Sequence, residues 1–368
     1  MAIIWSEGFD AYPIASAFSP WYPSYTKWTG GYGGYGIGQS PGSEIVNSSR
    51  FSPSKGKCVH FKIAGTQHYK CNLNLLKTSG NIDIMNVNLP IMIVGFAFYR
   101  TGYDTSQNII RLGNNDSEQF RLVQGTDKIL KVALGNGTII DTSTLSLTAG
   151  AWYYIELKVA FSTTTTGSYE LRVDDQLVLS GTDLQTSVNS ETCNQITIGA
   201  SVSSWNEDLR YDDMYIVDPS FGPSTDFLGP CIIKALYPNA DTAVKDFTPS
   251  TGTDNYAMVD DTTGPSASDY VTSNLLGSKD EYDITELNEL PQTVHGVVLS
   301  TAGYKTGTTT VGVKHYVNSN DVESSETFSA IGTTNTQRHT VFELDPDGDQ
   351  AWTLTSINNL KIGIEVAE

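Results

Sequence analysis

The stretch Trp152-Tyr-Tyr-Ile-Glu-Leu-Lys-Val159 and the later stretch Tyr169-Glu-Leu-Arg-Val-Asp-Asp-Gln-Leu-Val178 decide the fold. In the second stretch, apolar residues at 169, 171 and 173 alternate with charged residues at 170 and 172. A period of two places one face of a strand in a core and the other face in water. The sequence therefore predicts antiparallel strands here, each with one buried face.

Short strand-like runs of this kind fill the chain of 368 residues, and they end repeatedly in Gly, Asn, Asp or Ser. No long stretch has a helical period, so the sequence predicts an all-β protein. Residues 219–230 contain three prolines and two glycines, which cannot sustain a sheet ladder. We therefore predict a first domain at residues 1–220, a linker at 221–230 and a second β-domain at 231–368.

Four features of the first half follow one another in a familiar order. Trp152 opens a strand, Val173-Asp-Asp175 makes a hairpin, Ile196-Thr-Ile-Gly199 follows, and a closing strand contains Tyr211-Asp-Asp213. This order resembles the laminin G-like, concanavalin A-like jelly roll. The resemblance implies a jelly-roll sandwich, followed by a smaller β-sandwich-like domain. Since that family often has Gly where this chain has Asp175, the hairpin turn is expected to differ.

The second half carries another set of motifs: Phe247-Thr-Pro-Ser, Asn255-Tyr-Ala-Met-Val-Asp-Asp261, and Leu344-Asp-Pro followed by Ala351-Trp-Thr. This set is similar to a module of bacteriophage virion proteins. The resemblance implies a non-enzymatic virion component, made in the host cytoplasm, that decorates the head or tail. Its partners would then be other virion proteins, in a homo-oligomer or a symmetric array. The alternative is an adhesin, similar to a tail-fibre receptor-binding protein, that binds a host surface glycan.

The charge of the chain excludes some partners. The net charge is −19, and residues 223–368 contain 7 basic and 21 acidic side chains. This excess of acid repels phosphate backbones, so we expect no nucleic-acid partner. The start has neither the charge nor the apolar run of a signal peptide, and no run is long enough to span a bilayer, so no membrane insertion is expected. A cytoplasmic origin favours four reduced cysteines.

Two acidic motifs are candidates for a catalytic centre. In a regular strand, Asp212 and Asp213 point to opposite faces and cannot act as an acid–base pair, and Asp218 lies too far from Asp212. Glu281-Tyr-Asp-Ile-Thr-Glu286 is similar to the catalytic string of jelly-roll β-glucanases, but it lies in the other half of the chain. We interpret it as an acidic loop. The sequence therefore predicts no catalytic residues, no cofactor and no enzyme.

The carboxylates near the closing strand have one functional alternative. Asp212 and Asp213 could hold a structural Ca²⁺ together with Asp10 or Glu7 of the first strand, although calcium takes six or more oxygen ligands. The simpler interpretation is that Asp212 or Asp213 accepts hydrogen bonds from backbone amides or a tyrosine hydroxyl at the end of the sheet.

A glycine-rich segment near the start carries closely spaced aromatic residues. Exposed Trp and Tyr rings stack on sugars and anchor protein interfaces. The other interpretation is that these rings fold back and cap the sandwich. The candidate contacts for a glycan or a protein partner are Trp21, Tyr25, Trp28, Tyr32 and Tyr35.

Overall fold

The structure is a computed structural model that describes most of the chain. Every structural statement below concerns the described residues. They are 2–10, 28–30, 43–48, 50, 56–63, 70–75, 87–199, 207–262, 266, 268–289, 291, 293–328, 331–333 and 336–367.

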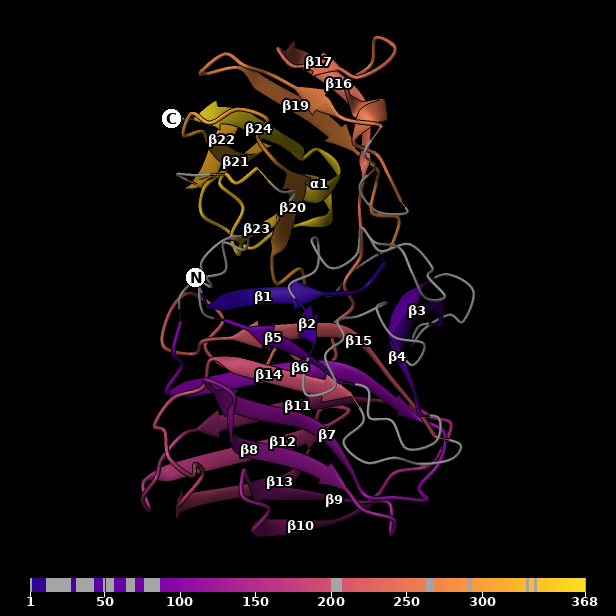
Figure 1. The fold of residues 1–368 in the computed structure, drawn as a ribbon, viewed down its shortest axis with the longest axis vertical. Coiled ribbons are helices and arrows are strands. Elements are labelled where there is room, and N and C mark those ends of the chain that lie inside the picture. The colour runs from indigo at the N-terminus through magenta and orange to yellow at the C-terminus, as the bar shows by residue number, and fades with distance from the viewer. Residues whose placement is uncertain are drawn as a thin grey trace.

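Two antiparallel sheets form the larger part of the protein (Figure 1). The eight-stranded sheet, called sheet A here, has the order β13-β12-β11-β6-β15-β4-β3, and β1 pairs with β15. Its strands are β1 (Ile3–Glu7), β3 (Ser43–Asn47), β4 (Lys57–Ile63), β6 (Ile91–Arg100), β11 (Trp152–Ala160), β12 (Gly167–Val173), β13 (Gln176–Leu184) and β15 (Glu207–Val217).

The seven-stranded sheet, called sheet B here, has the order β10-β9-β8-β7-β14-β5-β2. Its strands are β2 (Trp28–Gly30), β5 (Lys70–Asn74), β7 (Gln107–Asn114), β8 (Ser117–Gln124), β9 (Ile129–Leu134), β10 (Ile139–Ser146) and β14 (Gln195–Gly199).

The main hydrophobic core contains side chains from both sheets. In β12 the side chains of Tyr169, Leu171 and Val173 are buried in it, whereas Glu170 and Arg172 remain partly exposed. This is the alternation that the sequence predicts, and the all-β class and the jelly-roll sandwich are confirmed.

The hairpin between β12 and β13 turns through Asp174 and Asp175, whose φ angles are 48° and 66°. Two consecutive left-handed residues match the right-handed twist of the flanking strands. Asp tolerates this conformation better than most side chains do. The turn therefore forms without the glycine expected at position 175.

A second group of strands lies at one end of the sandwich (Figure 1). Its five-stranded sheet, sheet D, has the order β16-β19-β24-β21-β22. These strands are β16 (Pro238–Lys245), β19 (Lys279–Ile284), β21 (Gly312–Ser319), β22 (Val322–Phe328) and β24 (Lys361–Ala367). Shorter elements are β17 (Thr248–Pro249), β18 (Val271–Thr272), β20 (Val297–Gly303), β23 (Thr336–Phe342), the 3-10 helix η2 (Tyr256–Met258) and α1 (Leu354–Asn358). Among the described residues, no helix is long and apolar enough to cross a membrane.

The segment from Asp218 to Tyr237 contains no strand, but hydrogen bonds and apolar contacts hold it against sheet A. Leu228 donates its backbone N–H to the Tyr215 hydroxyl at 3.1 Å, and Gly229 donates to Glu156 Oε1 at 2.9 Å. Phe227 and Leu228 also pack against the buried side chains on the outer face of sheet A. The predicted domain limits at 220 and 231 stay predictions. Cys58, Cys193 and Cys231 are free thiols, while the side chain of Cys71 lies outside the described residues.

A single carboxylate joins the first strand to the second group of strands. Glu343 accepts the backbone N–H of Ala2 at 2.6 Å and that of Ile3 at 3.0 Å. Gly222 passes beside this contact with a φ of 70°, and a Cβ there would lie 2.5 Å from the Ala2 nitrogen. The two amides therefore depend on Glu343 for their acceptor, and the crowding beside them leaves no room for a side chain at position 222.

Replacing Glu343 by Ala should lower the free energy of unfolding by about 2–4 kcal/mol, because two buried N–H groups lose their acceptor. The conservative Glu343→Gln variant keeps one strong acceptor and should lose less. Urea denaturation measures both. Glu289→Ala, which removes an exposed partner of Lys234, is the control and should change stability by less than about 1 kcal/mol. Equal unfolding midpoints for Glu343→Ala and the native protein would contradict the role given to this carboxylate.

Candidate functional site

The strand β15 is irregular at the two aspartates that the sequence singles out. Asp212 pairs with Ala97 and Tyr215 pairs with Gly95, so Asp213 and Met214 lie opposite a single residue of β6. Asp213 has a φ of 48°, as expected in a β-bulge. The expectation that regular alternation separates Asp212 from Asp213 is therefore wrong, because β15 is not regular there.

Burial dominates the chemistry of these carboxyl groups. It raises the pKa of Asp212 to about 10, with a further contribution from the negative charge of Asp213. Burial also raises the pKa of Asp213 to about 7, against the hydrogen bond that Ile233 donates. The pKa of Asp10 is raised by burial too, and its charge raises the pKa of both other groups. The three groups thus lie close enough to interact electrostatically.

The hydrogen bonds of these groups go to the backbone. Asp213 Oδ1 accepts the N–H of Ile233 at 2.8 Å, and Asp212 Oδ1 accepts that of Asp213 at 2.9 Å. Asp10 Oδ1 accepts the N–H of Lys57 at 2.7 Å. Within the part of the chain that the structure describes, no group of three or more His, Cys, Asp or Glu side chains is arranged to hold a metal ion. A calcium ion at Asp10, Asp212 and Asp213 therefore stays a prediction.

The raised pKa of Asp212 makes stability depend on pH. The folded state keeps a proton that the unfolded state releases above its ordinary pKa of 3.8. The stability that this proton gives is complete below about pH 4 and falls as pH rises toward 10. Asn keeps the acceptor of Asp212 but cannot ionise. The Asp212→Asn variant should thus match the native protein near pH 4 and exceed its free energy of unfolding by at least about 1 kcal/mol at pH 8.

Thermal unfolding at both pH values measures this difference, and equal Tm values at pH 8 would contradict it. Added Ca²⁺ tests the predicted ion in the same experiment. A calcium held by Asp212 would raise the Tm of the native protein at pH 8 and leave that of Asp212→Asn unchanged.

The predicted aromatic contact region is mostly outside the structural description. Trp21, Tyr25, Tyr32 and Tyr35 lie outside the described residues. Only the backbone of Trp28 is described, in β2, where it pairs with Leu73 of β5. A partner or glycan contact at these rings stays a prediction.

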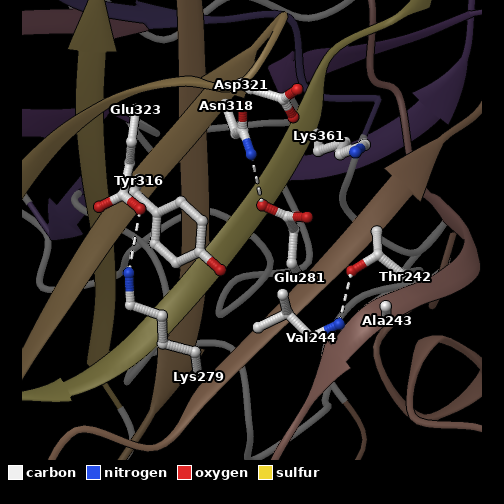
Figure 2. A pocket seen from close by; sticks show the side chains of 10 residues that line it. All are labelled: Thr242, Ala243, Val244, Lys279, Glu281, Tyr316, Asn318, Asp321, Glu323 and Lys361. Carbon is white, nitrogen blue, oxygen red and sulfur yellow. Dashed lines mark hydrogen bonds and ion pairs between the residues drawn. The ribbon is translucent and has the colours of Figure 1, made fainter.

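An open hollow of about 300 Å³ lies on one face of sheet D (Figure 2). It lies at the lower end of the range of small-molecule sites, roughly 300–1,000 Å³. In the sheet, Gly363 of β24 stands between Glu281 of β19 and Tyr316 of β21. A Cβ at Gly363 would lie 2.1 Å from Tyr316 Cζ, so only glycine lets the tyrosine ring lie across β24. This ring forms one wall of the hollow.

Glu281 is a buried charged residue that lines the hollow, with a side chain from a strand and not from the expected acidic loop. It is only 5 % exposed, and it lies in β19, whereas Glu286 lies beyond the end of that strand. Asn318 Nδ2 donates to Glu281 Oε2 at 2.9 Å. No described residue donates to the other oxygen, Oε1. Oε1 is not one of the buried polar atoms that lack a partner, so it is accessible at the hollow and can accept a hydrogen bond from a ligand.

Two lysines and two glutamates form a closed charge network beside the tyrosine ring. Lys314 contacts Glu323 at 2.7 Å and Glu365 at 3.1 Å, and Lys279 contacts the same two carboxylates at 3.0 and 3.3 Å. The hydrogen bond to Glu323 raises the pKa of Lys314 above its ordinary value. These four charges therefore neutralise one another.

Two other charged groups at the hollow are not neutralised in this way. Lys361 and Asp321 have no ion-pair partner among the described residues. Lys361 lies two residues before Gly363 on β24, which places it diagonally across from Glu281, a separation of roughly 7–8 Å. The hollow thus offers a free ammonium group, a free carboxylate and the unmet oxygen of Glu281.

Comparison with known proteins gives no sequence match: no family model and no curated protein matches this chain. Several solved structures are similar. An alginate lyase from Aplysia kurodai is 12% identical, with a TM-score of 0.41, 60% of this chain covered and 100% of that chain. The endo-β-1,4-glucuronan lyase from the fungus Trichoderma reesei is 15% identical, with a TM-score of 0.36 and coverage of 48% and 86%. The binding domain of Paraclostridial Mosquitocidal Protein 1 is 13% identical, with a TM-score of 0.34 and coverage of 48% and 42%. At this identity the similarities show the fold alone.

These findings correct two expectations from the sequence. The structures named are polysaccharide lyases and a toxin's binding domain, and none is a virion protein. A non-enzymatic structural component of a phage virion is therefore wrong as the main interpretation, and so is the statement that the protein is not an enzyme. The alternative of glycan binding agrees better with this set. A location in a virion, and a symmetric array there, stay untested.

Proposed function

We propose that this protein binds carbohydrate, and that the hollow on sheet D holds a sugar unit. The observation that carries the proposal is the largely buried Glu281, with one oxygen held by Asn318 and the other accessible at the hollow. A sugar hydroxyl can donate to Glu281 Oε1 and accept from Lys361 at the same time, since a hydroxyl is both donor and acceptor.

The side chains around Glu281 are held in place by contacts of their own. Asn318 fixes one carboxylate oxygen, and Tyr316 is held by Gly363 and by the bond from its hydroxyl to the Asp280 carbonyl at 3.3 Å. These side chains are therefore positioned before a ligand arrives, which reduces the entropy lost on binding.

Calorimetric titration with oligosaccharides of several classes tests the proposal. Glu281→Gln and Lys361→Ala should each weaken binding at least about ten-fold, which corresponds to about 1.4 kcal/mol. Asp254→Asn removes a carboxylate of the same group of strands that does not line the hollow, and it should bind like the native protein. The proposal fails if no oligosaccharide binds, or if both hollow variants bind as tightly as the native protein.

A further inference from the structure

The charges around the hollow indicate which sugars it selects, and this inference rests on the proposed function. The closed charge network contributes nothing to the net charge around the hollow, because its two lysines and two glutamates neutralise one another. These residues are Lys279, Lys314, Glu323 and Glu365. Glu281, Asp321 and Lys361 remain, and together they carry one net negative charge. A ligand that neutralises this remaining charge is a cation.

The net charge of the second half of the chain is negative as well. Residues 223–368 contain 7 basic and 21 acidic side chains. The resulting negative field attracts cations toward the hollow and opposes the approach of carboxylated sugars. A uronate would also place a second carboxylate near the largely buried Glu281, where the two like charges repel.

We infer that the hollow selects a sugar unit that bears a free, protonated primary amine, as in a deacetylated hexosamine. The ammonium group would donate to Glu281 Oε1, which has no donor among the described residues. A ring hydroxyl would accept from Lys361. Asp321, at the exposed turn before β22, would add to the attraction without needing direct contact.

Acetylation of the amine provides the sharpest comparison, because it removes the positive charge and leaves the rest of the sugar unchanged. Three trisaccharides would be titrated at about pH 6: one of glucosamine, one of N-acetylglucosamine and one of glucuronate. We expect the glucosamine trisaccharide to bind at least about five-fold more tightly than the acetylated one, and the glucuronate trisaccharide to bind most weakly. The preference for the amine should shrink as salt rises from about 20 to 300 mM, because surface charges are screened.

Matched variants separate a defined site from general attraction to an acidic protein. Glu281→Gln and Asp254→Asn each remove one negative charge from the same group of strands. Only Glu281→Gln should abolish the preference for the amine. This variant should bind the glucosamine and N-acetylglucosamine trisaccharides about equally, and both more weakly than the native protein does. Circular dichroism checks that both variants fold.

The outcomes distinguish this inference from the proposed function. If no trisaccharide binds, the proposed function fails. If the acetylated or the glucuronate trisaccharide binds as tightly as the amine, or if Asp254→Asn reduces amine binding as much as Glu281→Gln does, the inference fails. Binding of carbohydrate through the hollow would still stand where Glu281→Gln weakens it.

Discussion

The central strands of sheet A, β6, β11 and β15, are covered on both faces, and the rest of the structure depends on this. Its inner face packs on sheet B around Phe96 and Leu157. Its outer face packs under Phe227 and Leu228, against Tyr154 and Tyr215. A strand buried on both faces must be apolar nearly throughout, which is why β6 reads Ile-Met-Ile-Val-Gly-Phe-Ala-Phe-Tyr-Arg with so little alternation. The same double burial holds the segment after β15 in place, and through it the group of strands that carries the hollow.

The sequence predicts most of this fold where strands are regular and less where they are not. In β12 buried and partly exposed side chains alternate as the apolar and charged residues of the sequence do, because one face of the strand contacts solvent. β15 does not, because a bulge at Asp213 inserts an extra residue that no propensity distinguishes from a regular position. The sequence predicts an acidic loop at Glu281–Glu286, whereas the structure has the strand β19, with Asp280 on its inner face. That aspartate is fully buried, with bonds from the Phe247 amide at 2.8 Å and from Asn255 at 2.6 Å, and only the folded chain supplies these donors.

The hollow shows the same limit more sharply. Its charged residues come from strands far apart in sequence, so no spacing marks them as one site. Glu281 does lie inside a motif, but that motif is similar to the catalytic string of β-glucanases and does not indicate this hollow. What brings them together is register, with Gly363 between Glu281 and Tyr316. The sequence shows a glycine at position 363 within the apolar run of β24. The reason for it appears only in the structure, where a Cβ at this position would clash with the Tyr316 ring.

The bond between Glu343 and the amides of residues 2 and 3 also sets an order of events. Residues 2 and 3 leave the ribosome well before their acceptor, which is made 340 positions after Ile3. Until Glu343 emerges, the beginning of β1 has two amides without the partner they keep in the finished protein. Contacts between residues so far apart close late and slowly. The edge of sheet A at β1 is therefore completed only after the sandwich behind it.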